Sequence, residues 1–421
     1  MKLLFNSPFI LSSLVLVSVP AIASEDATLF PVPELSGNLC TREVLTGDWG
    51  GFRQSLADKG IQLDVSLHQY YQGVTDGGRG RDSWEDSGSL DYRLKIDTGK
   101  AGWWEGGFIE IHGETYFGNS VSSNVGALMP VNTDNALREP NGEGTYLSHV
   151  VITQFLSEQF AVFFGKLDTT VGDANDFAHG TGDEKFQNIA FSFNPVTLMS
   201  APYSTLGAGF FWLPNETTTI SFSAYDLEGD LESSGFDTVF EDGSGYNVEL
   251  QFVTDFGGKP GHQRFGFTYA DGDFVSLNDP RILLPPLPVS VDDGTWNVYY
   301  NFDQYLRYDP DTGAGWGVFG RLGIADEETN PIPLFASVGI GGTGLFEGRE
   351  NDRFGIGYYY LETSDELPGF LLSGEEHGVE LFYDFEMTPF WRLAADLQII
   401  SPALKSADTA TVFGLRSSLD F

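Results

Sequence analysis

The chain has 421 residues, of which 60 are acidic and 22 are basic, and its net charge of −38 argues against nucleic acid or an anionic lipid surface as a partner. The single cysteine, Cys40, excludes an internal disulfide. Fifty-one glycines and 14% aromatic residues are typical of an all-β chain with many turns.

Residues 1–23 have the pattern of a secretory signal peptide. A basic start at Lys2 precedes an apolar stretch over 3–19, and Ala21-Ile22-Ala23 resembles a cleavage site. The alternative, a transmembrane helix, would require about 20 cleaner apolar residues. The pattern therefore predicts an exported protein.

Residues 24–45 are a polar lead without periodicity, in which we interpret Cys40 as an unpaired thiol. In the next segment, 46–60, Trp49, Phe52 and Leu56 follow at helical spacing, and Gly60 ends the pattern. We expect a short periplasmic helix there, followed by one domain over 61–421.

Three consecutive segments, 61–68, 90–97 and 109–117, alternate apolar residues with polar or charged ones. A period of two indicates strands with one apolar and one polar face. Six titratable residues share the polar face of the second and third segments: Asp91, Arg93, Lys95, Glu110, His112 and Glu114. Such a face is difficult to bury in a soluble sandwich, and it is natural in a water-filled barrel.

Further strands are predicted along the rest of the chain. They lie near 145–156, 159–167, 205–213, 216–226, 244–255, 261–271, 294–306, 314–325, 333–341, 352–363, 376–387, 388–400 and 409–421. Long and short connections alternate almost throughout, except around 326–332 and 342–351. This alternation predicts an all-β fold, a transmembrane antiparallel barrel of about 16 strands, with long external loops and both termini on the periplasmic side.

The last segment, 409–421, ends on an aromatic residue, and Phe413, Leu415, Leu419 and Phe421 lie on one face. An ordinary half-buried strand of a soluble protein is the alternative. In a barrel, we expect this strand to pair with 61–73, with Leu415 toward lipid and Arg416 toward the lumen.

A family resemblance is carried by Leu45-Thr-Gly-Asp-Trp-Gly-Gly-Phe-Arg53 and Leu56-Ala-Asp-Lys-Gly-Ile61, and is supported by 335–345, 348–360 and 376–384. The chain resembles the carbohydrate-selective porins of the OprB family from about residue 45 to 421. The resemblance implies a 16-stranded barrel in the outer membrane of a Gram-negative bacterium, which admits monosaccharides such as glucose by passive diffusion. It also implies that the assembly machinery reads the carboxy-terminal Phe421.

The lumen charges on 91–95 and 110–114 are the first candidate contacts for a sugar, because charged groups replace water at its hydroxyls. Mutual salt bridging without a solute role is the alternative. The longest connection, 168–204, is the candidate to narrow the pore, and packing on the outer rim is its alternative. Its candidate lining residues are Asp168, Asp173, Asp176, Phe177, Lys185, Phe186 and Tyr203.

No catalytic or cofactor motif is recognised, and the six histidines show no metal-ligand spacing. We therefore predict no enzyme, no cofactor and no metal. The expected partners are monosaccharides, outer-membrane lipid and lipopolysaccharide. A general or cation-preferring porin is the first alternative, since a negative mouth concentrates cations, and an exported soluble β-protein is the second.

Overall fold

The computed structural model describes residues 30–80, 83–136, 144–170, 173–229, 231–279, 281, 288–310, 312–367 and 369–421. The predicted signal peptide, 1–23, lies outside these residues. Within them, no helix has the length and apolar character needed to cross a membrane.

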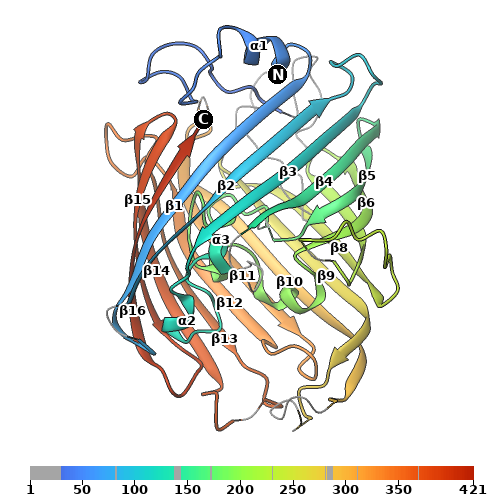
Figure 1. Ribbon diagram of the computed structural model, residues 1–421, viewed down its shortest axis with the longest axis vertical. Helices are drawn as coiled ribbons and strands as arrows, with labels where there is room; N and C mark the ends of the chain where they lie inside the picture. The colour runs from blue at the N-terminus through green and yellow to red at the C-terminus, as the bar shows by residue number, and fades with distance from the viewer. Residues whose placement is uncertain are drawn as a thin grey trace.

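Antiparallel strands close into one barrel, in which each strand pairs with its neighbours in sequence and the last strand pairs with the first (Figure 1). The strands are β1 Ile61–Gly78, β2 Ser83–Asp97, β3 Gly107–Gly118, β4 Gly144–Ser157, β5 Phe160–Asp168, β6 Ser204–Asn215, β7 Thr218–Asp226, β8 Gly243–Asp255, β9 Pro260–Val275, β10 Val291–Tyr308, β11 Gly315–Ala325, β12 Leu334–Thr343, β13 Arg353–Glu362, β14 Glu375–Thr388, β15 Trp391–Ser401 and β16 Asp408–Asp420. The predicted fold class, an all-β antiparallel barrel of 16 strands, is confirmed.

The closing pair joins β1 to β16 in a register that places Leu67 opposite Leu419 and Tyr71 opposite Leu415. It extends from Ser66 to Gly78, further along the first strand than the predicted 61–73. Its last part contains register shifts after Val74, where the two strands depart from regular pairing.

Side chains alternate between the two faces of the wall along each strand. On β16, Val412 and Arg416 are buried toward the lumen, whereas Phe413 and Leu415 are exposed on the outer surface. This is the orientation predicted for Leu415 and Arg416. The outer surface is apolar, as a hydrocarbon environment requires.

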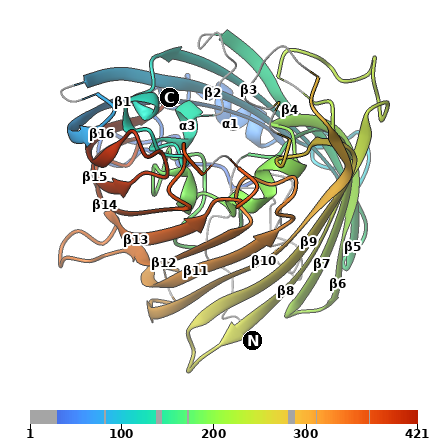
Figure 2. The same ribbon diagram turned by 90° about the horizontal axis from the view of Figure 1, so that it is seen from below.

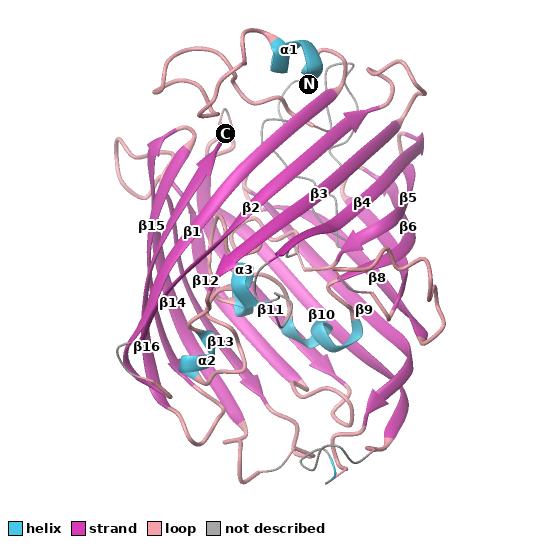
Figure 3. Ribbon diagram, viewed as in Figure 1, coloured by secondary structure: helices cyan, strands magenta, loops and turns pink. Residues whose placement is uncertain are grey.

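Helices are few and short (Figure 3). They are α1 Phe52–Ala57, α2 Ser122–Val125, α3 Thr133–Ala136 and the 3-10 helices η1 Ile189–Phe191 and η2 Pro195–Ser200. Helix α1 occupies only part of the predicted 46–60, because Trp49, Gly50 and Gly51 have positive φ angles that a helix cannot continue through. It lies at the same end of the barrel as the C-terminus (Figure 1).

Candidate functional site

Two connections at the end opposite α1 turn back into the barrel (Figure 2). From the connection between β3 and β4, Asn132 Nδ2 donates to Gln72 Oε1 at 3.0 Å. From the connection between β5 and β6, Asn188 Nδ2 donates to Gln398 Oε1 at 3.0 Å. Both acceptors are buried side chains of wall strands. Residues 173–203 of the longest connection therefore fold into the barrel, which is the first of the two courses considered for it. The connection between β3 and β4 also folds into the barrel, and this was not predicted.

Phenylalanine rings fix the longer inward segment to glycines on the wall. A side chain at Gly317 would meet the ring of Phe177, one at Gly355 would meet that of Phe186, and one at Gly357 would meet that of Phe191. These rings belong to one buried aromatic cluster with Phe319, Phe335, Tyr359 and Phe382 of the wall. Phe177 and Phe186 are only 2% and 1% exposed, so they anchor the segment and their rings are not available to a solute.

Replacing Gly357 by alanine should loosen this anchor. The new Cβ would lie 2.5 Å from the Phe191 ring, so the ring must move, at a cost of about 1–3 kcal/mol in the free energy of unfolding. Urea titration of the protein in lipid vesicles measures the change. Gly369→Ala is the matched control, because no atom lies within 4 Å of its Cβ. Equal stability of the two variants would contradict the packing argument.

Charged wall residues hold the same segment through its side chains and backbone. The guanidinium of Arg321 makes two hydrogen bonds of 2.7 Å to the carboxylate of Asp173. Arg416 donates to the carbonyl oxygens of Gly182 and Lys185 at 2.6 and 2.8 Å. The carboxylate of Glu380 accepts the backbone N–H groups of Gln187 and Asn188. The segment is therefore a fixed part of the channel wall.

Three charged groups of this segment carry shifted pKa values. Burial lowers the pKa of Lys185 to about 8, so its positive charge declines as the pH rises through that value. The ion pair with Arg353, at 3.5 Å, lowers the pKa of Glu184 to about 2. Burial, followed by the nearby Asp303 carboxylate, raises the pKa of Asp176.

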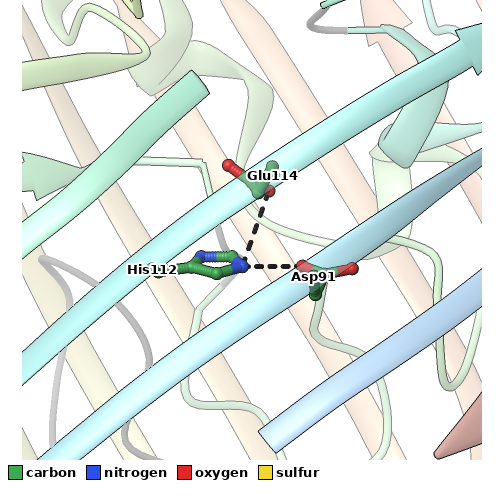
Figure 4. A group of neighbouring side chains, drawn as sticks. All are labelled: Asp91, His112 and Glu114. Carbon is green, nitrogen blue, oxygen red and sulfur yellow. Dashed lines mark hydrogen bonds and ion pairs between the residues drawn. The ribbon is translucent and has the colours of Figure 1, made fainter. Parts of the chain in front are cut away.

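Asp91, His112 and Glu114 come together on the inner face of β2 and β3 (Figure 4). His112 Nε2 lies 2.7 Å from Asp91 Oδ1 and 4.0 Å from Glu114 Oε1. The hydroxyl of Tyr116 donates to Glu114 at 2.9 Å, and that of Tyr203 donates to it at 3.2 Å. All three titratable residues are buried, so this part of the predicted site is an internally paired network.

The other charges of the predicted site have more access to the lumen. Arg93 lies 3.4 Å from Asp91, and Lys95 lies 3.2 Å from Asp64. The side chains of Arg93 and Lys95 are 17% and 12% exposed, compared with 4% for His112. Arg93 and Lys95 are therefore the members of the predicted group best placed to contact a solute.

The remaining predicted residues lie deeper in the wall. Glu110 is buried on β3, opposite Lys95 in the strand register. Asp168, at the end of β5, accepts hydrogen bonds from the N–H and hydroxyl of Thr170. Asp168, Phe177 and Phe186 are thus buried away from the lumen surface. Strand alternation predicts which face a residue lies on, but it did not predict that these three side chains would be covered.

Two groups of side chains have the composition of a metal site: Asp91, His112 and Glu114, and Asp176, His262 and Asp303. In each group the possible ligand atoms lie within 4.8 Å of one another. An arginine accompanies each group, since Arg93 lies 3.4 Å from Asp91 and Arg264 lies 2.6 Å from Asp303. Asp91 and Asp303 are each bonded to an imidazole and paired with an arginine, and Glu114 accepts hydrogen bonds from two tyrosines, so the donor sets fit salt-bridged networks better than metal centres.

A closed antiparallel barrel with an apolar outer surface, a polar lumen and an inward loop defines an outer-membrane porin. The family model described as "Carbohydrate-selective porin, OprB family" matches residues 81–421. The chain belongs to this family, as the resemblance implied, although the motif at 45–61 lies before the matched residues. Its location is therefore the outer membrane of a Gram-negative bacterium. The short turns lie at the end of the barrel that carries α1, and we propose that this end faces the periplasm.

Similar proteins span almost the whole chain. A putative porin, QuiX, of Acinetobacter baylyi is 24% identical over 90% of this chain and 93% of its own length. Porin B of Pseudomonas aeruginosa is 23% identical over 88% of this chain and 90% of its own length. A structure of Pseudomonas putida OprB, at high pH, covers 92% of this chain and 100% of its own, with a TM-score of 0.80 and 21% identity. The structural likeness supports the barrel fold.

Proposed function

We propose that this porin passes neutral, glucose-like monosaccharides by passive diffusion, without a cofactor and without catalysis. The observation that carries the proposal is the pairing of opposite charges at the lumen surface, where Arg93 and Lys95 lie beside Asp91 and Asp64. Paired charges offer donors and acceptors to sugar hydroxyls, while their low net charge avoids strong attraction of ions. Weak contacts of this kind allow a solute to enter and to leave.

Proteoliposome uptake tests this function. Glucose should enter faster than uncharged solutes of similar size, and Arg93→Ala should reduce that advantage by about tenfold or more, because one hydrogen bond to a charged group contributes about 1.5–3 kcal/mol. Arg307→Ala is the control, since Arg307 is an exposed arginine near the end of β10. Equal entry of glucose and the reference solutes would refute sugar selectivity, and unchanged uptake by Arg93→Ala would remove Arg93 from the site.

A cation-preferring channel is the second candidate, and the net charge of −38 favours it. The two functions differ in their ion selectivity. A large reversal potential of cation sign in a salt gradient, together with no preference for glucose, would support the cation channel.

Assembly and membrane contacts complete the proposal. The final residue, Phe421, donates its backbone N–H to Val65 and accepts a hydrogen bond from Arg53. We propose that the barrel-assembly machinery recognises this aromatic terminus. We also propose that the outer surface of the barrel contacts lipid and lipopolysaccharide. Slower assembly of a Phe421→Ser variant in cells, with normal folding in detergent, is the expected result.

A further inference from the structure

The amino-terminal segment 30–45 packs against the channel instead of extending away from it. The ring of Phe30 lies edge-on to Phe108, with ring centres 5.7 Å apart. The ammonium group of Lys95 lies 5.9 Å from the centre of the same ring. Phe30 is 9% exposed, so it is enclosed by these neighbours.

The two neighbours of Phe30 belong to the lumen face of the wall. Lys95 shares that face with Asp91 and Arg93 on β2, and Phe108 shares it with Glu110 on β3. Phe108 also packs edge-on against Phe155 of β4, at 5.6 Å. Because side chains alternate along a strand, Phe30 meets the inner face of the barrel near its periplasmic end.

Contacts within the segment make it a defined structure. The backbone N–H of Glu43 donates to the carbonyl of Glu34 at 2.8 Å, and the N–H of Glu34 donates to the Glu43 carboxylate at 2.8 Å. The side chains of Leu35 and Val44, which follow these two residues in the chain, are 5% and 4% exposed. The segment therefore folds as a small closed loop with an apolar interior.

Further contacts fasten this loop to the seam of the barrel. The N–H of Leu45 donates to the carbonyl of Asp420 on β16 at 2.8 Å. Arg53 of α1 donates to the carbonyls of Leu63 and Phe421, and its guanidinium lies 4.0 Å from Asp64. Asp64 in turn pairs with Lys95, which links the loop, α1 and the first two strands across the mouth.

We propose that segment 30–45 forms part of the channel wall and that Phe30 is a size-determining residue at the periplasmic mouth. Lys95 lies one inward position closer to that mouth than Arg93, and Phe30 covers Lys95. A solute that leaves the charged part of the lumen along β2 therefore passes the Phe30 ring. The ring also limits the positions of the Lys95 ammonium group, since that group interacts with both Asp64 and the aromatic face.

Single-channel recording of the full-length mature protein in potassium chloride tests the proposal. Phe30→Ala should raise the conductance by about 1.5-fold, because pore width at a constriction controls ion flow. Val32→Ala is the matched control in the same segment, since Val32 is 42% exposed. Phe30→Leu should give an intermediate increase, and it preserves apolar packing if the alanine variant folds poorly.

A second measurement follows the segment directly. Cys40 is the single cysteine and is exposed, so a nitroxide label attached to it reports the mobility of the loop by electron paramagnetic resonance. The spectrum should sharpen in Phe30→Ala and remain unchanged in Val32→Ala. Conductance equal to that of the unmodified protein in both Phe30 variants would overturn the proposal, whatever the spectrum. These readouts use no sugar, so they are independent of the proposed selectivity.

Discussion

Replacing Arg321 by methionine should destabilise the protein by about 3–5 kcal/mol, because it leaves a charged partner unpaired in a largely buried place. The Arg321 side chain is fully buried, and Asp173 is 10% exposed. Besides its two bonds to Asp173, Arg321 donates to the carbonyl of Ala178. The variant should also release the inward segment and change the single-channel conductance. Urea titration in vesicles and planar-bilayer recording measure the two effects.

Arg281→Met is the control for this prediction. The arginine of its ion pair with Asp279 is 46% exposed, although the aspartate is 4% exposed, so Arg281→Met should cost less than the removal of the fully buried Arg321. A double-mutant cycle with Asp173→Asn isolates the coupling between Arg321 and Asp173. A coupling near zero would mean that the phenylalanine anchors alone hold the segment, and the ion pair would lose its structural role.

The barrel was predictable because its determinants are local. Alternation along 109–117 places Glu110, His112 and Glu114 on one face whatever the partner strand is, and the strand register of β2 and β3 confirms that face. The length of β1 was underestimated because Gln69-Tyr70-Tyr71-Gln72 breaks the alternation, and glycines and register shifts follow before the strand ends at Gly78. Strand number and closure therefore followed from the pattern, whereas strand ends did not.

The inward loops were less predictable because their anchors are distant in sequence. Nothing near Phe191 indicates that Gly357 will receive its ring, and nothing near Met129 indicates that its backbone N–H will donate to Glu376. Alternating glycines on β12 and β13 were a usable signal. Gly339 and Gly341, like Gly355 and Gly357, recur at every second position, which marks a wall that leaves space for other side chains.

The sequence predicted which residues of the candidate site face the lumen, but it did not predict how exposed each of these side chains is. Spacing identified Arg93 and His112 as lumen-facing, but it could not separate the partly exposed Arg93 from the buried His112. Tyr203 comes from the inward segment and donates to Glu114 beside His112, and alternation along a strand does not predict such a contact. The exposure of a lumen-facing side chain in this channel therefore depends on the inward loops as well as on the strands.

Replacing Leu381 by arginine should destabilise the barrel by about 2–4 kcal/mol, because a charge on the lipid face near the bilayer midplane must leave water. Leu381 lies at the middle of β14 and is 48% exposed on the outer surface. Its cross-strand neighbours, Ile356 and Leu397, are also exposed and apolar, so no acidic partner is close by. Unfolding free energies in vesicles measure the loss.

Replacing Leu156 by arginine tests whether the loss of stability depends on the depth of the charge in the bilayer. Leu156 is 65% exposed on the second last position of β4, close to the short turn, where an arginine reaches the headgroups and costs about 0–1 kcal/mol. The physical argument requires the Leu381 variant to lose more stability than the Leu156 variant. If both lose the same amount, the penalty would come from local packing, and the apolar surface around Leu381 would not be the lipid-facing band of the barrel.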